Sequence, residues 1–315
     1  MTSSVRNLLA DASLKLAVAA GDLGLDRQIL TQELNRPCLE LTGYFRAFRS
    51  ERIQIFGKGE VGYIEEFSHR KESKLRDYLD RIFASKVPCA IVTNGLQPPP
   101  LLIAVANDHK IPILTCRHRT TKLYKRLWEH LDMEFAPEII QHGVLLDIHD
   151  IGVLILGDSS VGKSECALEL IRRGFHLVAD DMVTIKCLSD SQLVGRATEM
   201  LPYHMEARGI GIIDIRRLFG AAAIRPYKRI TLAITLVEWE QAGPIDRLGI
   251  EEKTLEILEV SIPHIRIPIR PGRNVGTLVE VAALNHKLKN LGVHTAQEME
   301  REVMAHSQPA QKEKK

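Results

Sequence analysis

Hydrophobic positions in the first 130 residues follow helical spacing in some stretches and strand spacing in others. Apolar residues recur three or four positions apart over residues 5–20 and stop at Gly21, which predicts a helix. The alternation over residues 52–56 and the apolar run over residues 89–93 predict strands. The same spacing predicts a short helix over residues 101–109, a strand over 112–115 and a charged, amphipathic connecting helix over 120–131. Strands that alternate with helices in this way predict a small α/β domain, and no chemical motif falls within it.

The pattern changes near residue 132, where we place a domain boundary, so the two predicted domains span residues 1–132 and 133–305. Three neighbouring elements are predicted in the second domain: a buried strand over residues 153–156, a helix over 164–173 that ends at Gly174, and a strand over 176–179. Residues 306–315 are polar and rich in lysine, which predicts a flexible, solvated tail.

Composition narrows the class of protein. The 315 residues are 45% hydrophobic and 26% charged, as in ordinary globular proteins, and their number suggests two domains. Lys and Arg number 42 and Asp and Glu 40, so the net charge of 42 − 40 = +2 does not favour a nucleic-acid partner. No apolar run reaches the ~18 residues of a membrane span, and the first residues lack the pattern of a secretory signal. Five scattered cysteines without a Cys-x-x-Cys pair are typical of reduced thiols, so we expect a cytoplasmic protein.

The strongest chemical signal is a phosphate-binding loop. The segment Gly157–Ser164 matches G-x-x-x-x-G-K-[ST] and lies between a predicted strand and a predicted helix. Backbone N–H groups of such a loop surround phosphate oxygens, Lys163 would bring its charge to the β and γ phosphates, and the Ser164 hydroxyl would ligate Mg²⁺. The predicted nucleotide-binding residues are Gly157, Asp158, Ser159, Ser160, Val161, Gly162, Lys163 and Ser164. The alternative is a glycine turn that happens to precede a helix.

Two adjacent carboxylates follow the next predicted strand. Asp180 and Asp181 would lie at the carboxyl end of that strand, within reach of a metal ion or of an attacking hydroxyl. Asp180 follows Lys163 by 17 residues, a shorter distance than in common P-loop NTPases. One aspartate would serve the metal and the other would act as a base, and the residues alone do not say which. The alternative is a pair of solvated turn residues.

Six stretches of the second domain form a combination that is far more specific than the loop alone. They are Gln141–Ile148, Gly157–Glu165, Leu177–Asp181, Met205–Asp214, Ile245–Gly249 and Ile267–Asn274. In these stretches the sequence resembles the HPr kinase/phosphorylase family, the bifunctional serine kinases of bacterial sugar-uptake regulation. The first 130 residues resemble the family more loosely, through Leu39–Phe45 and Glu51–Gln54. One departure is Ser160, where the family commonly has glycine; a serine serves there only if the loop does not require a positive φ.

The resemblance implies a fold, an activity and partners. It implies a C-terminal P-loop kinase domain similar to the nucleotide-binding core of phosphoenolpyruvate carboxykinase. It implies that ATP, with Mg²⁺, phosphorylates a serine of the phosphocarrier protein HPr. It also implies the reversal by phosphorolysis, in which inorganic phosphate attacks phosphoserine and pyrophosphate leaves. Members of the family are homohexamers.

The resemblance also implies site residues. The catalytic residues would be His142, Lys163, Asp181 and Arg247, and the Mg²⁺ ligands Ser164 and Glu206. The stretch 205–214 would serve both reactions, and 268–273 would serve dephosphorylation. These residue types suit the chemistry, because a carboxylate can accept the serine proton, cations stabilise the charge on the transferred group, and Mg²⁺ prefers carboxylate and water. For His142, a structural role stands beside a hydrogen bond that holds the loop or senses the phosphate.

Two further candidates carry positive charge. Arg270 and Arg273 form a basic turn that would hold the attacking phosphate of the reverse reaction, or would be solvated on the surface. Arg208 stands in a largely apolar stretch, and if it is buried, a carboxylate or the protein substrate must pair with it.

Two other functions compete with the kinase. One is a regulatory module that is gated by nucleotide and transfers no phosphoryl group to protein. The other is a general P-loop NTPase, which the short distance from Lys163 to Asp180 makes less favourable. The sequence assigns no role to the N-terminal domain.

Overall fold

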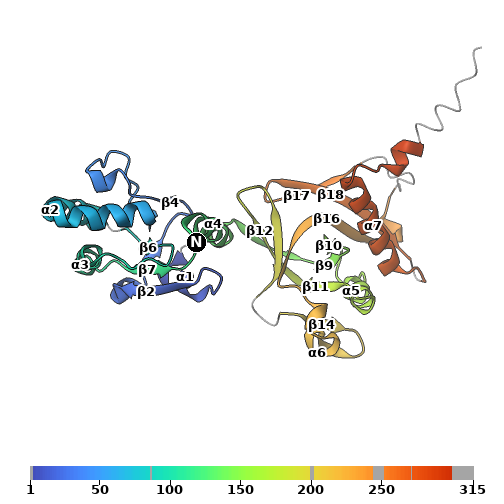
Figure 1. The fold of residues 1–315 in the computed structure, drawn as a ribbon. Coiled ribbons are helices and arrows are strands. Elements are labelled where there is room, and N and C mark those ends of the chain that lie inside the picture. The colour runs from blue at the N-terminus through green and yellow to red at the C-terminus, as the bar shows by residue number, and fades with distance from the viewer. Residues whose placement is uncertain (1–2, 86, 199–201, 244–251, 271, 300–315) are drawn as a thin grey trace, which may run out of the picture. The chain divides into compact units, whose positions relative to one another are not determined.

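The structure is a computed structural model that describes residues 3–85, 87–198, 202–243, 252–270 and 272–299. The chain divides into two compact units, Met1–Ala136 and Pro137–Lys315 (Figure 1). Both units combine helices with sheets, which confirms the predicted α/β class. Among the described helices, none is both long enough and apolar enough to cross a membrane.

The first unit is built on a five-stranded sheet in the order β2-β7-β6-β5-β4. Its elements are β1 (Ser3–Ser4), α1 (Val5–Ala10), β2 (Leu16–Ala20), β3 (Gln28–Ile29), β4 (Leu34–Asn35), β5 (Ile53–Phe56), α2 (Lys58–Ala84), β6 (Ala90–Val92), α3 (Pro100–Asp108), β7 (Ile113–Cys116) and α4 (Thr120–Phe135). Strands β4, β5, β6 and β7 pair in parallel, and β2 pairs antiparallel with β7. The predicted strands over residues 52–56, 89–93 and 112–115 are therefore confirmed, each within about two residues at its ends.

The helix predicted over residues 5–20 is wrong in its second half. Helix α1 ends at Ala10, and residues 16–20 form the edge strand β2. The side chain of Asp11 accepts a hydrogen bond from the N–H of Ser13, a local turn that competes with the helix. The apolar residues that follow find their partners in β7, so main-chain pairing prevails over the helical spacing of the sequence.

Two other helices differ from the sequence pattern. Helix α2 is long and was not predicted, because its buried apolar residues fall in two groups on either side of a kink at Lys71. They are Val61 and Ile64 before the kink, and Leu75, Leu79, Ile82 and Phe83 after it. Helix α4 was predicted to connect the domains. Its Leu123, Leu127 and Leu131 are fully buried in the core of the first unit, so this helix is a structural part of that unit.

The second unit contains a sheet in which nine strands are described, ordered β11-β9-β10-β16-β13-β12-β8, with β18 also paired to β16 and β17 paired to β18. Its elements are β8 (Glu138–His142), β9 (Val144–Ile148), β10 (Ile151–Leu156), α5 (Lys163–Arg172), β11 (His176–Ala179), β12 (Met182–Cys187), β13 (Leu193–Ala197), β14 (His204–Ala207), β15 (Gly211–Asp214), α6 (Ile215–Phe219), β16 (Tyr227–Glu238), β17 (Thr254–Ile257), β18 (Val260–Ile269) and α7 (Val275–Asn290). The strands and the helix predicted between residues 153 and 179 are confirmed.

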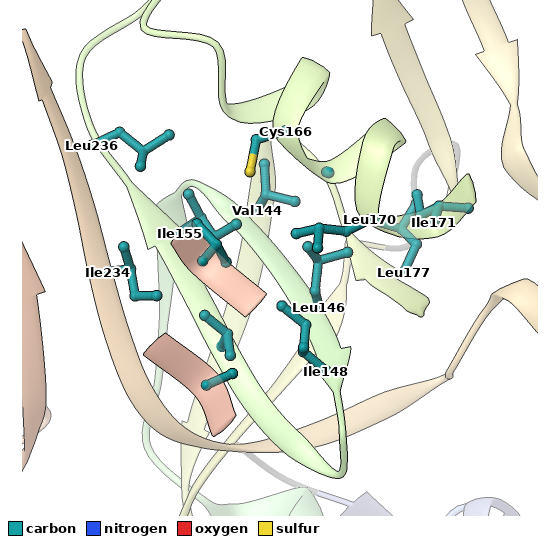
Figure 2. Packing of buried hydrophobic residues seen from close by; sticks show 14 of the residues in the cluster. Val144, Leu146, Ile148, Ile155, Cys166, Leu170, Ile171, Leu177, Ile234 and Leu236 are labelled. Atoms are coloured by element: carbon teal, nitrogen blue, oxygen red, sulfur yellow. The ribbon is translucent and has the colours of Figure 1, made fainter. Parts of the chain in front are cut away.

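The core of the second unit lies between this sheet and helices α5 and α7. Side chains of β9, β10 and β16 pack against Cys166, Leu170 and Ile171 of α5, as Figure 2 shows, and Val279 and Ala283 of α7 join the same cluster. Alternate residues of these strands face a second cluster on the other side of the sheet. Strands β10, β16 and β18 run parallel, so their carboxyl ends meet at one edge of the sheet.

Candidate active site

The loop after β10 runs against the end of β16. Gly157 has a φ of +141°, and a Cβ atom there would lie 2.5 Å from the carbonyl oxygen of Leu236, so only glycine allows this approach. Helix α5 begins at Lys163, directly after the loop. The first N–H groups of a helix have no partner within it, and with the helix dipole they favour an anion such as phosphate.

The ammonium group of Lys163 lies within the loop. Its Nζ donates hydrogen bonds of 2.8 Å to the carbonyl oxygens of Gly157 and Asp158, and the residue is buried. A buried ammonium group needs such acceptors, because desolvation without them is costly. Phosphate oxygens at this place would exchange with the two carbonyl groups as stronger, charged acceptors.

Ser160 adopts the conformation that the sequence argument had excluded for a serine. Its φ is +77°, in the left-handed region, so the loop does require a positive φ at this position. A left-handed conformation costs a residue with a Cβ atom about 1–2 kcal/mol. The loop therefore has the shape that glycine favours, and its serine stores strain.

Asp180 is the inner of the two carboxylates. The hydroxyl Oγ of Ser164 donates to it, at 3.2 Å from Oδ1 and 3.3 Å from Oδ2. Burial is the main cause that raises the pKa of Asp180 to about 6, and the negative charge of Asp181 acts in the same direction. This carboxylate is thus joined to the loop hydroxyl that was predicted to ligate Mg²⁺.

Asp181 is the outer carboxylate. Its side chain is 71% exposed, and its Oδ1 lies 3.0 Å from Nδ1 of His142. Its φ is +66°, and the N–H of Met182 donates to the carbonyl oxygen of Asp180 at 2.8 Å, which closes a three-residue turn around it. A γ-turn of this hand is rare and strained, and such strain persists only where the surrounding structure holds it, commonly at active sites.

His142 reaches Asp181 because of strand pairing. It is the last residue of β8 and lies opposite Met182 of β12, so its ring stands beside the preceding aspartate. The N–H of Gly143 also donates to the carbonyl oxygen of Asp181 at 2.9 Å, which helps to hold the strained turn. The partner of this histidine is therefore an exposed carboxylate at the mouth of the site.

The loop, the two carboxylates and β14 enclose one cleft of about 110 Å³. Its lining residues are His142, Val144, Ser159, Ser160, Gly162, Lys163, Ser164, Glu165, Asp180, Asp181, Glu206 and Arg208. Small-molecule pockets usually measure ~300–1,000 Å³, so this cleft is small, and most of the residues that line it are polar or charged. Arg208 is 61% exposed with its Nε 3.9 Å from Glu165, so the cost of a buried, unpaired guanidinium does not arise.

The predicted basic turn lies outside this lining. The guanidinium carbon of Arg270 is 3.2 Å from the centre of the Trp239 ring, and that of Arg273 is 5.7 Å from it. Such cation–π contacts orient a guanidinium group. Trp239 follows β16 and the turn follows β18, so both lie at the sheet edge where the loop follows β10. Arg247 falls outside the described residues.

Two residues of this region are not distinguished by the sequence pattern. Glu165 lies within a stretch that carries the resemblance, next to Ser164, but no pattern distinguishes it from an ordinary helix residue. Trp239 is one of two tryptophans, and its position directly after a long apolar strand was the one signal available.

Comparison with known proteins bears on this arrangement. Residues 133–303 match the HPr Serine kinase C-terminal domain, and residues 3–131 match the HPr Serine kinase N terminus. The chain belongs to the HPr serine kinase family. This confirms the resemblance seen in the sequence.

Relatives in this family match over almost their whole length. The HPr kinase/phosphorylase of Exiguobacterium sibiricum is 41% identical over 298 residues, which is 95% of each chain. That of Leptospira biflexa is 43% identical over 298 residues, which cover 94% of this chain and 92% of the relative. A solved structure of the Hpr(Ser) kinase/phosphatase from Coxiella burnetii is 36% identical, with a TM-score of 0.47, and covers 54% of this chain and 99% of its own.

The strain at Ser160 leads to a testable expectation. Ser160→Gly should raise the free energy of unfolding by about 0.5–1 kcal/mol. Glycine adopts the left-handed conformation without the steric cost that serine has, and this gain exceeds the cost of the entropy that glycine adds to the unfolded chain. Ser160→Val is the matched control and should lower it, since a β-branched residue tolerates a positive φ least. Denaturant unfolding of the three proteins measures both effects. Equal stability of the glycine and valine variants would contradict a positive φ at residue 160.

Proposed function

We propose that this protein transfers the γ-phosphoryl group of ATP to a serine of HPr and reverses the reaction by phosphorolysis with inorganic phosphate. The observation that supports this most is that two adjacent carboxylates have different surroundings. Asp180 is partly buried and bonded to the loop hydroxyl of Ser164, whereas Asp181 is exposed beside His142. A protein that only binds a nucleotide as a signal needs a carboxylate such as Asp180 near the phosphates, but it does not need an exposed base such as Asp181.

The nucleotide is proposed to bind with its phosphates in the loop Gly157–Ser164. Lys163 already lies inside the loop, so its ammonium group needs to exchange only two carbonyl acceptors for phosphate oxygens. It would then stabilise the charge that spreads over the transferred group, which is the main contribution a protein makes to phosphoryl transfer. We assign the same task to Arg247 from the family resemblance alone.

Ser164 and Glu206 fit a magnesium ion that binds together with the nucleotide. Within the described ranges, no three His, Cys, Asp or Glu side chains come close enough to hold a metal by themselves. Mg²⁺ is commonly held by one or two carboxylates together with substrate phosphates and water, and both residues line the same cleft. The ion would neutralise charge on the phosphates. The hydrogen bond from Ser164 to Asp180 would keep the hydroxyl oxygen turned toward that place.

Asp181 is proposed as the base. It would accept the proton of the HPr serine as the serine oxygen forms its bond to phosphorus and the bond to ADP breaks. Its exposure makes it accessible to a hydroxyl that arrives on another protein, which the inner Asp180 is not. In reverse, a phosphate oxygen attacks the phosphoserine phosphorus, the bond to the serine oxygen breaks, and Asp181 returns a proton to that oxygen as pyrophosphate forms. His142 would orient the carboxylate through the 3.0 Å contact.

We also propose that the protein is a homohexamer and that it works in the cytoplasm. Exposed apolar side chains recur at helical spacing along α7 and at the residue that caps its end; they are Leu278, Val281, Leu284, Leu288 and Leu291. A stripe of this kind is typical of a surface that is covered in an assembly, which supports the homohexamer that the family resemblance implies. None of the five cysteines is part of a disulfide bond, as expected in the reducing cytoplasm where we place the reaction.

Transfer of label from ATP tests the proposed function directly. With ATP labelled in the γ position and HPr, we expect label on a serine of HPr, and unlabelled phosphate should then release it as pyrophosphate. HPr with its serines replaced by alanine is the control and should stay unlabelled. If ATP binds and no label reaches HPr, the protein is a nucleotide-gated module; if label appears only in free phosphate, it is a general NTPase.

The role of Asp181 is tested by Asp181→Asn, which keeps the size of the side chain and removes the proton acceptor. We expect phosphoryl transfer to fall by about 10²–10⁴-fold while nucleotide affinity changes little. Rapid-quench measurement of transfer, with equilibrium binding of ATP, separates the two effects. Asp180→Asn is the comparison and should mainly weaken the magnesium-dependent binding of ATP. An unchanged rate in Asp181→Asn together with a loss in Asp180→Asn would move the base to Asp180.

The basic turn is tested by Arg273→Ala. We expect phosphorolysis to lose more activity than the kinase reaction, because only phosphorolysis needs a site for a second phosphate. Arg273→Lys keeps the charge without the bidentate geometry and should recover part of the loss. The measurement is kcat/KM for phosphate in one direction and for ATP in the other. Equal losses in the two directions would contradict a separate phosphate site.

A further inference from the structure

The junction between the basic turn and helix α7 is held by one side chain. Asn274 directly follows Arg273 and forms the N-terminal cap of α7, where its Oδ1 accepts a hydrogen bond of 2.7 Å from the N–H of Thr277. A capping residue has a defined backbone conformation, so its position also determines where the preceding turn leaves the helix. Any group that holds Asn274 therefore helps to hold Arg273.

Helix α5 and the residue that follows it, Arg173, supply such groups. The Nδ2 of Asn274 donates to Oε1 of Glu169 at 2.6 Å, and Nη2 of Arg173 donates to Oδ1 of Asn274 at 3.2 Å. Arg173 also donates to Glu169 at 2.5 Å and to the hydroxyl of Thr277 at 2.9 Å. The amide nitrogen of Asn274 thus has a partner on α5 and its amide oxygen has one on the residue that caps the end of α5, and both bonds involve a charged group, which strengthens them.

The two helices approach closely at this place. A Cβ atom on Gly276 would lie 2.7 Å from Oε2 of Glu169, so the start of α7 packs directly on this carboxylate. Val279 and Ala283 of α7 share the apolar cluster with α5. The contact between the helices is tight and specific, and a small shift of one helix would be transmitted to the other.

Helix α5 itself begins in the phosphate loop. Lys163 is its first residue, and Glu169 and Arg173 lie one and a half to three turns further along, so a rigid segment of about 10–15 Å joins the loop to Asn274. On its other side, the turn is held where Arg270 lies on the Trp239 ring, at 3.2 Å from the ring centre. The loop and the turn are thereby linked through the side chains of Glu169, Arg173 and Asn274, which do not line the cleft.

We propose that Glu169, Arg173 and Asn274 are positioning residues that set the place of the turn Arg270–Arg273 relative to the phosphate loop, and that phosphorolysis depends on them more than the kinase reaction does. This rests on the proposed role of the turn in binding inorganic phosphate. In phosphorolysis the attacking phosphate, held by the turn, must meet a phosphoserine at the cleft. Misplacement of a reacting group by about 1 Å can cost a factor of ~10² in rate. The kinase reaction uses the loop and Asp181, which have contacts of their own outside this clamp of Glu169, Arg173 and Asn274.

Two variants break the clamp from opposite sides. Asn274→Ser keeps a good helix cap for Thr277, but its shorter side chain reaches neither Glu169 nor Arg173. Glu169→Ala removes the acceptor on α5 and leaves the turn and the cap unaltered. For each, we expect kcat/KM for phosphate in phosphorolysis to fall about tenfold while the kinase rate stays within about twofold. The double variant should lose no more than either single variant, since both changes break the same connection.

Glu280→Ala is the matched control. Glu280 accepts a 2.7 Å hydrogen bond from Nη1 of Arg173 and also contacts His149, so its loss loosens the packing of α5 on α7 but leaves the bonds of Asn274 in place. Its ratio of phosphorolysis to kinase activity should equal that of the unaltered protein. Thermal unfolding of all four variants shows whether each is folded under the conditions of the assay.

Three results would overturn the clamp. The first is an equal loss of phosphorolysis and kinase activity in Asn274→Ser, and the second is additive losses in the double variant. The third is the same change in the ratio of phosphorolysis to kinase activity in Glu280→Ala, which would mean that the network contributes only to ordinary helix packing. These outcomes are separate from a failure of the proposed function. If Arg273→Ala itself lowers both activities equally, the role of the turn fails; if that variant is selective and the clamp variants are not, the role of the turn stands and the clamp alone is wrong.

Discussion

The arrangement of the second unit depends on the parallel pairing of β10 with β16 beneath helix α5. Ile155, Ile234 and their neighbours form an apolar surface on which Cys166 and Leu170 of α5 pack, as Figure 2 shows. Because the strands are parallel, their carboxyl ends fall at one edge, where the loop after β10 and the start of α5 lie. The loop approaches β16 so closely at Gly157 that it has little freedom of its own. A rigid apolar layer thus positions a polar edge.

At that edge, two neighbouring aspartates come to differ through their surroundings alone. Asp180 continues the direction of β11 toward the start of α5 and meets Ser164, whereas the reversed backbone at Asp181 turns its side chain outward to His142. The hydrogen bonds of Met182 and Gly143 maintain this reversal, so the strain at Asp181 is supported by strand pairing. Unlike environments are the general means by which two carboxylates obtain separate roles at one pH.

The site also has two sides with different kinds of support. On one side, strand pairing among β8, β9, β11 and β12 places His142 and the aspartates. On the other, Trp239 and the hydrogen bonds of Asn274 hold the basic turn. The N-terminal unit has its own apolar clusters, which include the leucines of α4.

The sequence by itself determined the features that depend on local chemistry. The spacing of glycines, lysine and serine in Gly157–Ser164, the apolar strand before it and the helix after it were all readable, because each follows from near neighbours in the chain. The combination of stretches from Gln141 to Asn274 was sufficient for the family. Only the tertiary structure decided which aspartate is inner and which outer, because that depends on a turn held by strands β8 and β12. It also decided that residues 16–20 pair with β7 in place of continuing a helix, that Ser160 takes a positive φ, and that Trp239 and Asn274 hold the basic turn. In each of these cases the partners lie far away in the chain, and their contacts outweigh the local preference of the residues concerned.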